Sequence, residues 1–180
     1  MKILKRILLA IGILVALLLV IALFVKKDYA VERSVSINKP KQEVFDYLKF
    51  LKNQDNFSVW MKLDPNTKKE YQGTDGTVGF ISAWDSENKN VGKGVQEIKK
   101  ITDGERIDSQ IHFIKPFDGL AQAYMATQAE ADTQTKVTWG FKSEMAYPMN
   151  LMLLFMDMDK ILGKDLEEGL RNLKDIQEKK

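Results

Sequence analysis

The single histidine, His112, is the first residue whose type could support catalysis or metal binding. It lies in residues 106–115, where polar and apolar side chains alternate as in a strand with one face in a core. Its own side of this alternation also carries Asp108 and Gln110, so we expect His112 to face solvent. A metal site needs two or three converging ligands, and a Ser-His-Asp triad needs its histidine in a cleft. We therefore interpret His112 as a surface residue, with a functional role as the alternative, and assign no metal ligand.

Five acidic residues near the C-terminus resemble the paired carboxylates of an acid–base site. They lie in a segment whose apolar residues recur every three or four positions, and basic residues are interleaved with them. This spacing places them on the solvated face of a helix, where exposed ion pairs form. We therefore expect ion pairing rather than catalysis. The acidic residues are Asp157, Asp159, Asp165, Glu167 and Glu168, and the basic ones are Lys160, Lys164 and Arg171.

General acid–base catalysis in a pocket would require a buried carboxyl, phenol or imidazole group. The nearest candidates are Tyr124, Tyr147, Asp118 and Glu144, and none has a partner visible in the sequence. The chain has no cysteine, which excludes disulfides, thiolate zinc sites and a cysteine nucleophile. The glycines in 73–79 precede a strand and lack the Lys-Ser/Thr pair of a phosphate-binding loop. We assign no catalytic residue and no cofactor.

Aromatic residues and methionines form a second candidate set. Residues 134–145 alternate between apolar and polar side chains, and five of the eight methionines fall between 145 and 158. Such side chains fill a core in many proteins; alternatively they line a cavity, for which flexible methionine is well suited. The residues assigned to the lining of such a cavity are Trp60, Phe80, Trp84, Phe113, Phe117, Trp139, Phe141, Met145, Met149, Met152 and Met156.

Periodicity predicts the elements that would hold these side chains. The expected strands cover 29–37, 68–72, a strand with Val78, Phe80, Ser82 and Trp84 on one face, about 91–101, 106–115, 119–131 and 134–145. An amphipathic helix is expected at about 40–52, and one long helix runs from Pro148 over about 30 positions. The simplest two-layer arrangement of this order is an α+β fold, with a curved antiparallel β-sheet wrapped around the long C-terminal helix.

An uninterrupted apolar segment precedes these elements: residues 7–25 are 19 residues without a charged or polar side chain. As a helix of about 28 Å it matches the hydrocarbon thickness of a bilayer. A cleaved signal peptide is the alternative, but its apolar region is usually shorter and ends in a small-x-small pattern that is missing before Lys26. A buried core helix is the second alternative, for which so small a domain has little room. We predict a transmembrane anchor over 1–27 and one domain over 28–180.

Charges around this segment favour a cytoplasmic N-terminus. Lys2, Lys5 and Arg6 precede it, whereas Lys26 and Lys27 follow it, so the domain is expected to be periplasmic or otherwise extracytoplasmic. These five residues also explain the net charge of +2, which sums 27 basic and 25 acidic residues. Without them 22 basic residues remain, and the domain carries −3. A weakly acidic domain argues against nucleic-acid binding.

Several short motifs of the domain resemble those of one superfamily. They are Trp60-Met61, Asp64-Pro65, the glycine-rich 71–79, 91–94, 105–107, 113–117 and 135–139. Across about 31–178 the chain resembles the START-like, or SRPBCC, superfamily, and within it a membrane-anchored member of the polyketide cyclase/dehydrase group. The resemblance implies a helix-grip fold with a cavity between the sheet and the C-terminal helix. It also implies binding of lipids, sterols, polyketides, quinones or other hydrophobic molecules, a minority of members being enzymes.

Three functions remain open on these grounds. The favoured one is a membrane-tethered, non-enzymatic binding module for a hydrophobic small molecule or lipid. The second is a polyketide cyclase/dehydrase-like enzyme that uses general acid–base chemistry in the same pocket. The third is a protein-interaction module, which a broad exposed apolar patch without a closed cavity would favour. We expect the membrane and a hydrophobic ligand as partners, and neither a metal nor nucleic acid.

Overall fold

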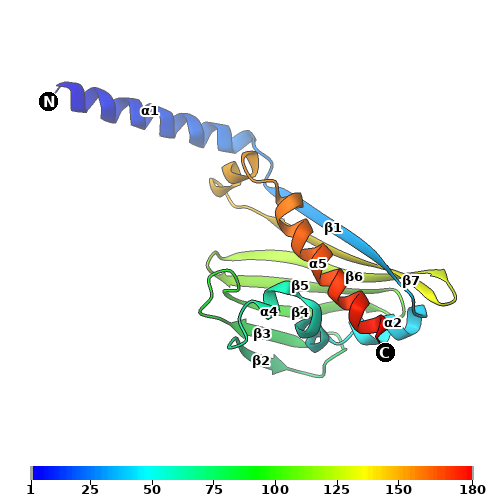
Figure 1. Cartoon of the computed structure of the whole chain (residues 1–180). Coiled ribbons are helices and arrows are strands. Elements are labelled where there is room, and N and C mark those ends of the chain that lie inside the picture. The colour runs from blue at the N-terminus through cyan, green and yellow to red at the C-terminus, as the bar shows by residue number, and fades with distance from the viewer. Residues whose placement is uncertain (1, 180) are drawn as a thin grey trace.

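A seven-stranded antiparallel sheet forms the body of the protein in a computed structural model that describes residues 2–179 (Figure 1). The strands are β1 (Asp28–Ile37), β2 (Lys68–Gln72), β3 (Ile81–Asp85), β4 (Lys93–Thr102), β5 (Arg106–Lys115), β6 (Gly119–Ala131) and β7 (Gln134–Glu144). Their order across the sheet is β1-β7-β6-β5-β4-β3-β2, a meander from β2 to β7 that β1 closes at one edge. The strands predicted at 106–115 and 119–131 have the bounds of β5 and β6.

The helices are α1 (Lys2–Phe24), α2 (Lys41–Leu48), the 3₁₀ helix η1 (Leu51–Asn53), α3 (Gln54–Phe57), α4 (Val59–Lys62), the 3₁₀ helix η2 (Met149–Leu154) and α5 (Met158–Glu178). The helices α2 to α5 lie on the inner face of this curved sheet, whereas α1 extends away from the domain (Figure 1). The long α5 lies along β1, and α3 and α4 pack against α5. This is the α+β helix-grip arrangement predicted from the sequence.

The hydrophobic core lies between α2, α5 and the inner face of the sheet. Alternate residues of each strand contribute to it, as the period-two pattern requires. The fully buried side chains include Phe45 of α2, Phe57 of α3, Val137 of β7 and Leu170 of α5. The opposite face of α5 is exposed and charged, so its helical periodicity reflects packing on the sheet.

Ion pairs fix α5 to β1. Arg33 projects from the inner face of β1, where its guanidinium bonds Asp159 at 2.9 Å and Glu167 at 2.7 Å. Gly163 makes room for it, because a Cβ there would lie 2.1 Å from the guanidinium. Two of the five acidic residues therefore pair across the fold, whereas Asp157 pairs with Lys160 on its own helix at 2.9 Å. Asp159 and Glu167 therefore hold α5 against β1 through Arg33.

One end of the sheet, which we call the proximal end, receives α1. Asp28 begins β1 there and pairs with Glu144 at the end of β7. Ala121, near the start of β6, pairs with Ser143, so the loop between β5 and β6 lies at the same end. Since η2 follows β7, the last turns of α1, η2 and the β5–β6 loop share the proximal end.

The helix α1 is long and apolar enough to cross a membrane, and 6% of its most apolar stretch is buried. Its C-terminal end is joined to the domain through η2. The amide of Asn150, which is fully buried, donates to the carbonyl oxygens of Ala22 at 2.7 Å and Val25 at 3.0 Å. Ala22 is also fully buried. The end of α1 is therefore part of the packed structure.

Three predicted elements need correction. The single helix from Pro148 is wrong before Met158: η2 comes first, and Asp157 is extended and caps α5 by accepting from the Lys160 N–H at 3.1 Å. The strand carrying Val78 begins only at Ile81, because 77–80 form a turn in which Gly79 has a positive φ of 86°. The helix at 40–52 is shorter, since α2 ends at Leu48.

Candidate functional site

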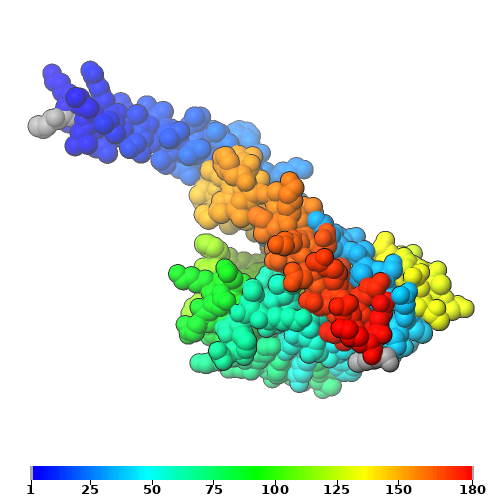
Figure 2. Space-filling view, viewed as in Figure 1, coloured from blue at the N-terminus to red at the C-terminus, as the bar shows by residue number. Residues whose placement is uncertain are grey.

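A cavity of about 340 Å³ lies between the inner face of the sheet and helices α3, α4 and α5. Strands β3 to β7 all contribute side chains to it. In the space-filling view the molecule is hollowed between the orange segment around the start of α5 and the green loops opposite (Figure 2). Leu162 and Leu166 of α5 line one side. The cavity thus lies between the sheet and the C-terminal helix, where the family resemblance implied one.

Tryptophans dominate the lining: all three of the chain, Trp60, Trp84 and Trp139, face the cavity. Trp60 meets Trp139 edge to face, with ring centroids 6.1 Å apart. Trp84 meets Phe113 in the same way at 6.2 Å. Phe141 lies 6.3 Å from Phe113 and continues the row. These rings form a largely apolar wall with the edge-to-face geometry that aromatic pairs prefer.

Two glycines set the positions of these tryptophans. Gly94 pairs with Trp84 across β3 and β4, and a Cβ at Gly94 would lie 2.4 Å from the indole ring. The indole N–H of Trp84 then donates to the Val91 carbonyl at 3.1 Å. On α5, a Cβ at Gly169 would lie 2.7 Å from the ring of Trp139. The glycines therefore leave the space that the two indole rings occupy.

The structure places some of the residues predicted to line the cavity in its lining and others elsewhere. Six of the eleven line it, namely Trp60, Trp84, Phe113, Phe117, Trp139 and Phe141. Phe80 belongs instead to the hydrophobic core, where it is buried and stacks on Tyr71 at 6.1 Å. The structure therefore places six of the seven predicted aromatic residues at this cavity.

The four predicted methionines lie away from this cavity. Met149 and Met152 belong to η2 and are 46% and 37% exposed. Met156 lines a different hollow, near the junction with α1. The Met145 N–H donates to the Lys27 carbonyl at 2.9 Å, next to the start of β1. The break before α5 explains this, because a continuous helix would have carried these residues over the sheet.

A charged pair at one side of the cavity was not anticipated. Asp55 of α3 and Lys69 of β2 line the cavity and form an ion pair of 2.6 Å. The Tyr71 hydroxyl donates to the same carboxylate at 3.2 Å. Burial, together with the negative charge of Asp55, raises the pKa of Tyr71 to about 12. The cavity therefore has an aromatic wall and, at Asp55 and Lys69, an ionic edge.

The residues considered for acid–base chemistry lie outside the cavity lining. His112 is exposed and contacts Asp118 at 3.2 Å on the outer face and its adjoining loop. Tyr147 lies beside α1, where its hydroxyl donates to the Leu19 carbonyl at 3.4 Å. Glu144 is exposed at the end of β7. Within residues 2–179, no three acidic or histidine side chains are grouped so that they could hold a metal ion.

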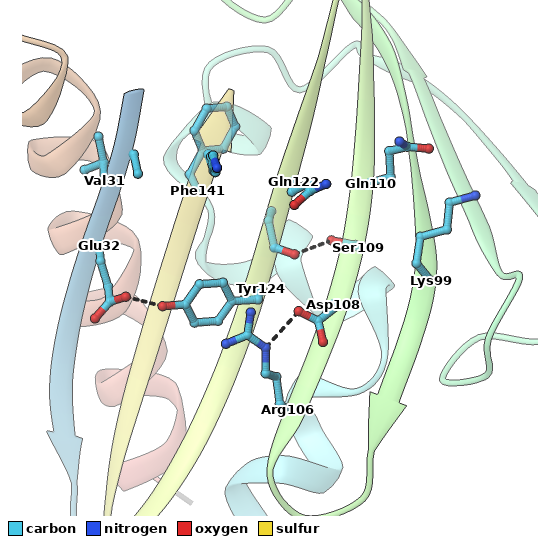
Figure 3. A pocket seen from close by; sticks show the side chains of 13 residues that line it. Val31, Glu32, Lys99, Arg106, Asp108, Ser109, Gln110, Gln122, Tyr124 and Phe141 are labelled. Atoms are coloured by element: carbon cyan, nitrogen blue, oxygen red, sulfur yellow. Dashed lines mark hydrogen bonds and ion pairs between the residues drawn. The ribbon is translucent and has the colours of Figure 1, made fainter. Parts of the chain in front are cut away.

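Tyr124 belongs to a second hollow, of about 510 Å³, on the outer face of the sheet (Figure 3). Its hydroxyl donates to Glu32, and the Arg106 guanidinium lies 3.6 Å from the centre of its ring. Arg106 also pairs with Asp108 at 2.8 Å. Burial, followed by the contact with Glu32, raises the pKa of Tyr124. These side chains contact one another from β1 to β5, across β7 and β6. The hollow is therefore a part of the outer face where side-chain contacts link the strands.

Comparisons with solved structures identify the fold. Ginseng major latex-like protein 151 from Panax ginseng has a TM-score of 0.61 at 13% identity, over 84% of this chain and 98% of that one. A Thalictrum flavum norcoclaurine synthase point mutant, in complex with a transition-state analogue, has a TM-score of 0.59 at 8% identity, over 82% and 95%. Ara h 8.0201 has a TM-score of 0.55 at 12% identity, over 85% and 99%.

At these identities the likeness shows the fold alone. No family model matches the chain, and the search of curated proteins finds no match. The structural neighbours nevertheless match along nearly their whole length, with 99% and 98% of two of those chains covered. The domain therefore has the helix-grip fold of these solved structures, with a curved antiparallel sheet and a long C-terminal helix across its inner face.

Proposed function

We propose that the protein is a single-pass, membrane-tethered binding module for a hydrophobic small molecule or lipid, of the kind found in membrane-anchored START-like proteins. The observation that carries the proposal is the cavity of about 340 Å³ walled by all three tryptophans. Its volume falls within the range of small-molecule sites, which are concave, mostly apolar and marked by a few polar groups. Asp55 and Lys69 would supply those polar groups here.

The junction with α1 supports a retained anchor over a removed signal sequence. Asn150 is fully buried and its amide is committed to two carbonyl oxygens at the end of α1. Removal of α1 would leave that amide without these partners, and a buried unpaired polar group costs about 1–3 kcal/mol. The excess of basic residues before the span supports an N-terminus in the cytoplasm, with the domain on the other side of the membrane.

The tryptophans provide the test, because each lines the cavity and reports on an occupant. The full chain is reconstituted in nanodiscs of saturated lipid and titrated with dibromostearate, whose bromines quench tryptophan at short range. We expect saturable quenching that unlabelled stearate reverses, together with co-purifying lipid detected by mass spectrometry. Quenching that rises linearly without saturation, and no retained lipid, would refute the binding function.

The acid–base enzyme remains a second candidate because one carboxylate, Asp55, does line the cavity. Its ion pair with Lys69 holds it in place beside the Tyr71 hydroxyl. If Asp55 acts as the general base on a bound substrate, Asp55→Asn abolishes the turnover of a hydrophobic ketone. Dibromostearate should still quench the tryptophans in this variant. A binding module shows no turnover in either protein.

A further inference from the structure

Exposed hydrophobic side chains gather at the proximal end of the domain. Large apolar residues are normally scattered singly over a protein surface, and a group of them marks a contact with a partner or a membrane. The most exposed is Phe155, at 84%, in the turn between η2 and α5. The others at this end are Phe117, Leu120, Tyr147, Met149, Met152, Leu154 and Ile161. We call this group the apolar rim.

The apolar rim is continuous with the end of α1. The end of α1 and the start of β1 border one hollow of about 820 Å³ together with residues 153–159, which carry Phe155 into α5. Phe24, the last residue of α1, is itself 84% exposed and faces the same hollow. Figure 2 shows the orange segment of η2 directly beside the blue end of α1. The exposed apolar side chains of η2 therefore adjoin the apolar surface of α1 where the two helices are in contact.

Hydrogen bonds fix the position of the apolar rim along the axis of α1. Tyr147 donates to the carbonyl of Leu19 and Asn150 to those of Ala22 and Val25. At 1.5 Å per residue, the step from Leu19 to Val25 covers about 9 Å. Val25 is followed at once by Lys26 and Lys27, and long basic side chains near the end of a spanning helix extend to the lipid headgroups. Thus η2 lies alongside the last turns of α1, at the depth where a spanning helix leaves the hydrocarbon.

We infer that the apolar rim docks on the bilayer that α1 spans, with η2 and Phe155 inserted at the boundary between headgroups and acyl chains. The inference rests on the proposed tether and adds an orientation to it. Phe117 belongs both to the apolar rim, at 71% exposure, and to the cavity lining. Docking therefore places the mouth of the cavity at the membrane surface, and the ligand class becomes an apolar molecule drawn from that bilayer.

A single spin label tests this docking in the intact protein. Because the chain has no cysteine, Phe155→Cys accepts one nitroxide at an exposed position where folding is not disturbed. The matched control is Asp132→Cys, exposed in the turn between β6 and β7 at the opposite end of the sheet. Both proteins are placed in nanodiscs, and the label's collisions with oxygen, which dissolves in lipid, are compared with those of a water-soluble nickel chelate.

We expect the label at position 155 to favour oxygen over nickel several-fold, while the label at 132 favours nickel. Equal nickel access at both positions overturns the docking alone, provided that the protein stays in cell membranes when they are washed with carbonate. Low access to both reagents at 155 indicates contact with protein and also overturns it. A chain that carbonate removes overturns the tether and the docking together, and dibromostearate quenching in the same samples reports separately on the cavity.

Discussion

Filling the cavity with a side chain should raise stability and lower ligand affinity at the same time. Ala123 lies on the inner face of β6, is 5% exposed and lines the cavity. Ala121 is its matched control, two residues earlier on the same face and 3% exposed, and the cavity lining does not include it. The same substitution, alanine to leucine, thus adds three carbons either to open space or to packed protein.

The two substitutions should change the melting temperature, Tm, in opposite directions. Three carbons buried in open space contribute about 2.4 kcal/mol, at about 0.8 kcal/mol for each buried methylene. The same carbons at Ala121 overpack the core, which costs about 1–3 kcal/mol. At roughly 2–4 °C per kcal/mol for a chain of this size, Ala123→Leu should raise Tm by about 5–10 °C, whereas Ala121→Leu should lower it.

Ligand binding gives the opposite order. A ligand that loses the space of three carbons loses about 2.4 kcal/mol, so the affinity of Ala123→Leu for dibromostearate should fall about fifty-fold. Ala121→Leu should keep the affinity of the original protein. Tm is followed by near-ultraviolet circular dichroism, and affinity by tryptophan quenching in nanodiscs. The reasoning is wrong if both variants melt earlier by similar amounts and Ala123→Leu binds as before.

Three further changes test other parts of the structure. Asn150→Leu leaves the carbonyls of Ala22 and Val25 without their donor, at a cost of about 1–3 kcal/mol. The distribution of distances between a spin label in α1 and one in the domain, measured by electron–electron resonance, should therefore become broader. The hydrogen bond from Arg33 lowers the pKa of Asp159 below its ordinary 3.8, so this pair stabilises the fold above that pH and its contribution is lost as the pH falls through the lower value. Arg33→Gln should therefore reduce stability in urea at neutral pH and flatten the loss of stability on acidification. Burial and the charge of Asp55 raise the pKa of Tyr71 to about 12, so this phenol should ionise late in an ultraviolet titration, and Asp55→Asn should bring it earlier.

Local sequence patterns were sufficient to predict most of the sheet. The bounds of β5 and β6 follow from strict alternation between strong breaks, Asp103-Gly104 before and Pro116 between them. The same parity placed Trp139 and Phe141 on the inner face, and this face is where the cavity lies. Alternation decides which side a residue faces, so aromatic lining residues could be found without knowing the fold.

The remaining parts depend on contacts between distant residues. Met149, Met152 and Phe155 recur with helical spacing, yet Asn150 bonds to α1, more than 120 positions earlier, and the extended Asp157 interrupts the helix. No local pattern predicts such a contact. The pair of Asp55 and Lys69 joins α3 to β2 in the same way. The methionines were therefore placed on the wrong surface, and the ionic edge of the cavity was not foreseen.

The connection between α1 and β1 determines how far the domain can travel. α1 ends at Phe24 and β1 begins at Asp28, so three residues join them. Fully extended, three residues reach at most about 10 Å, and here hydrogen bonds hold the junction closed. With α1 in a bilayer as proposed, the domain could not carry a ligand to a facing membrane. It would meet its ligand by lateral diffusion within the bilayer that α1 spans.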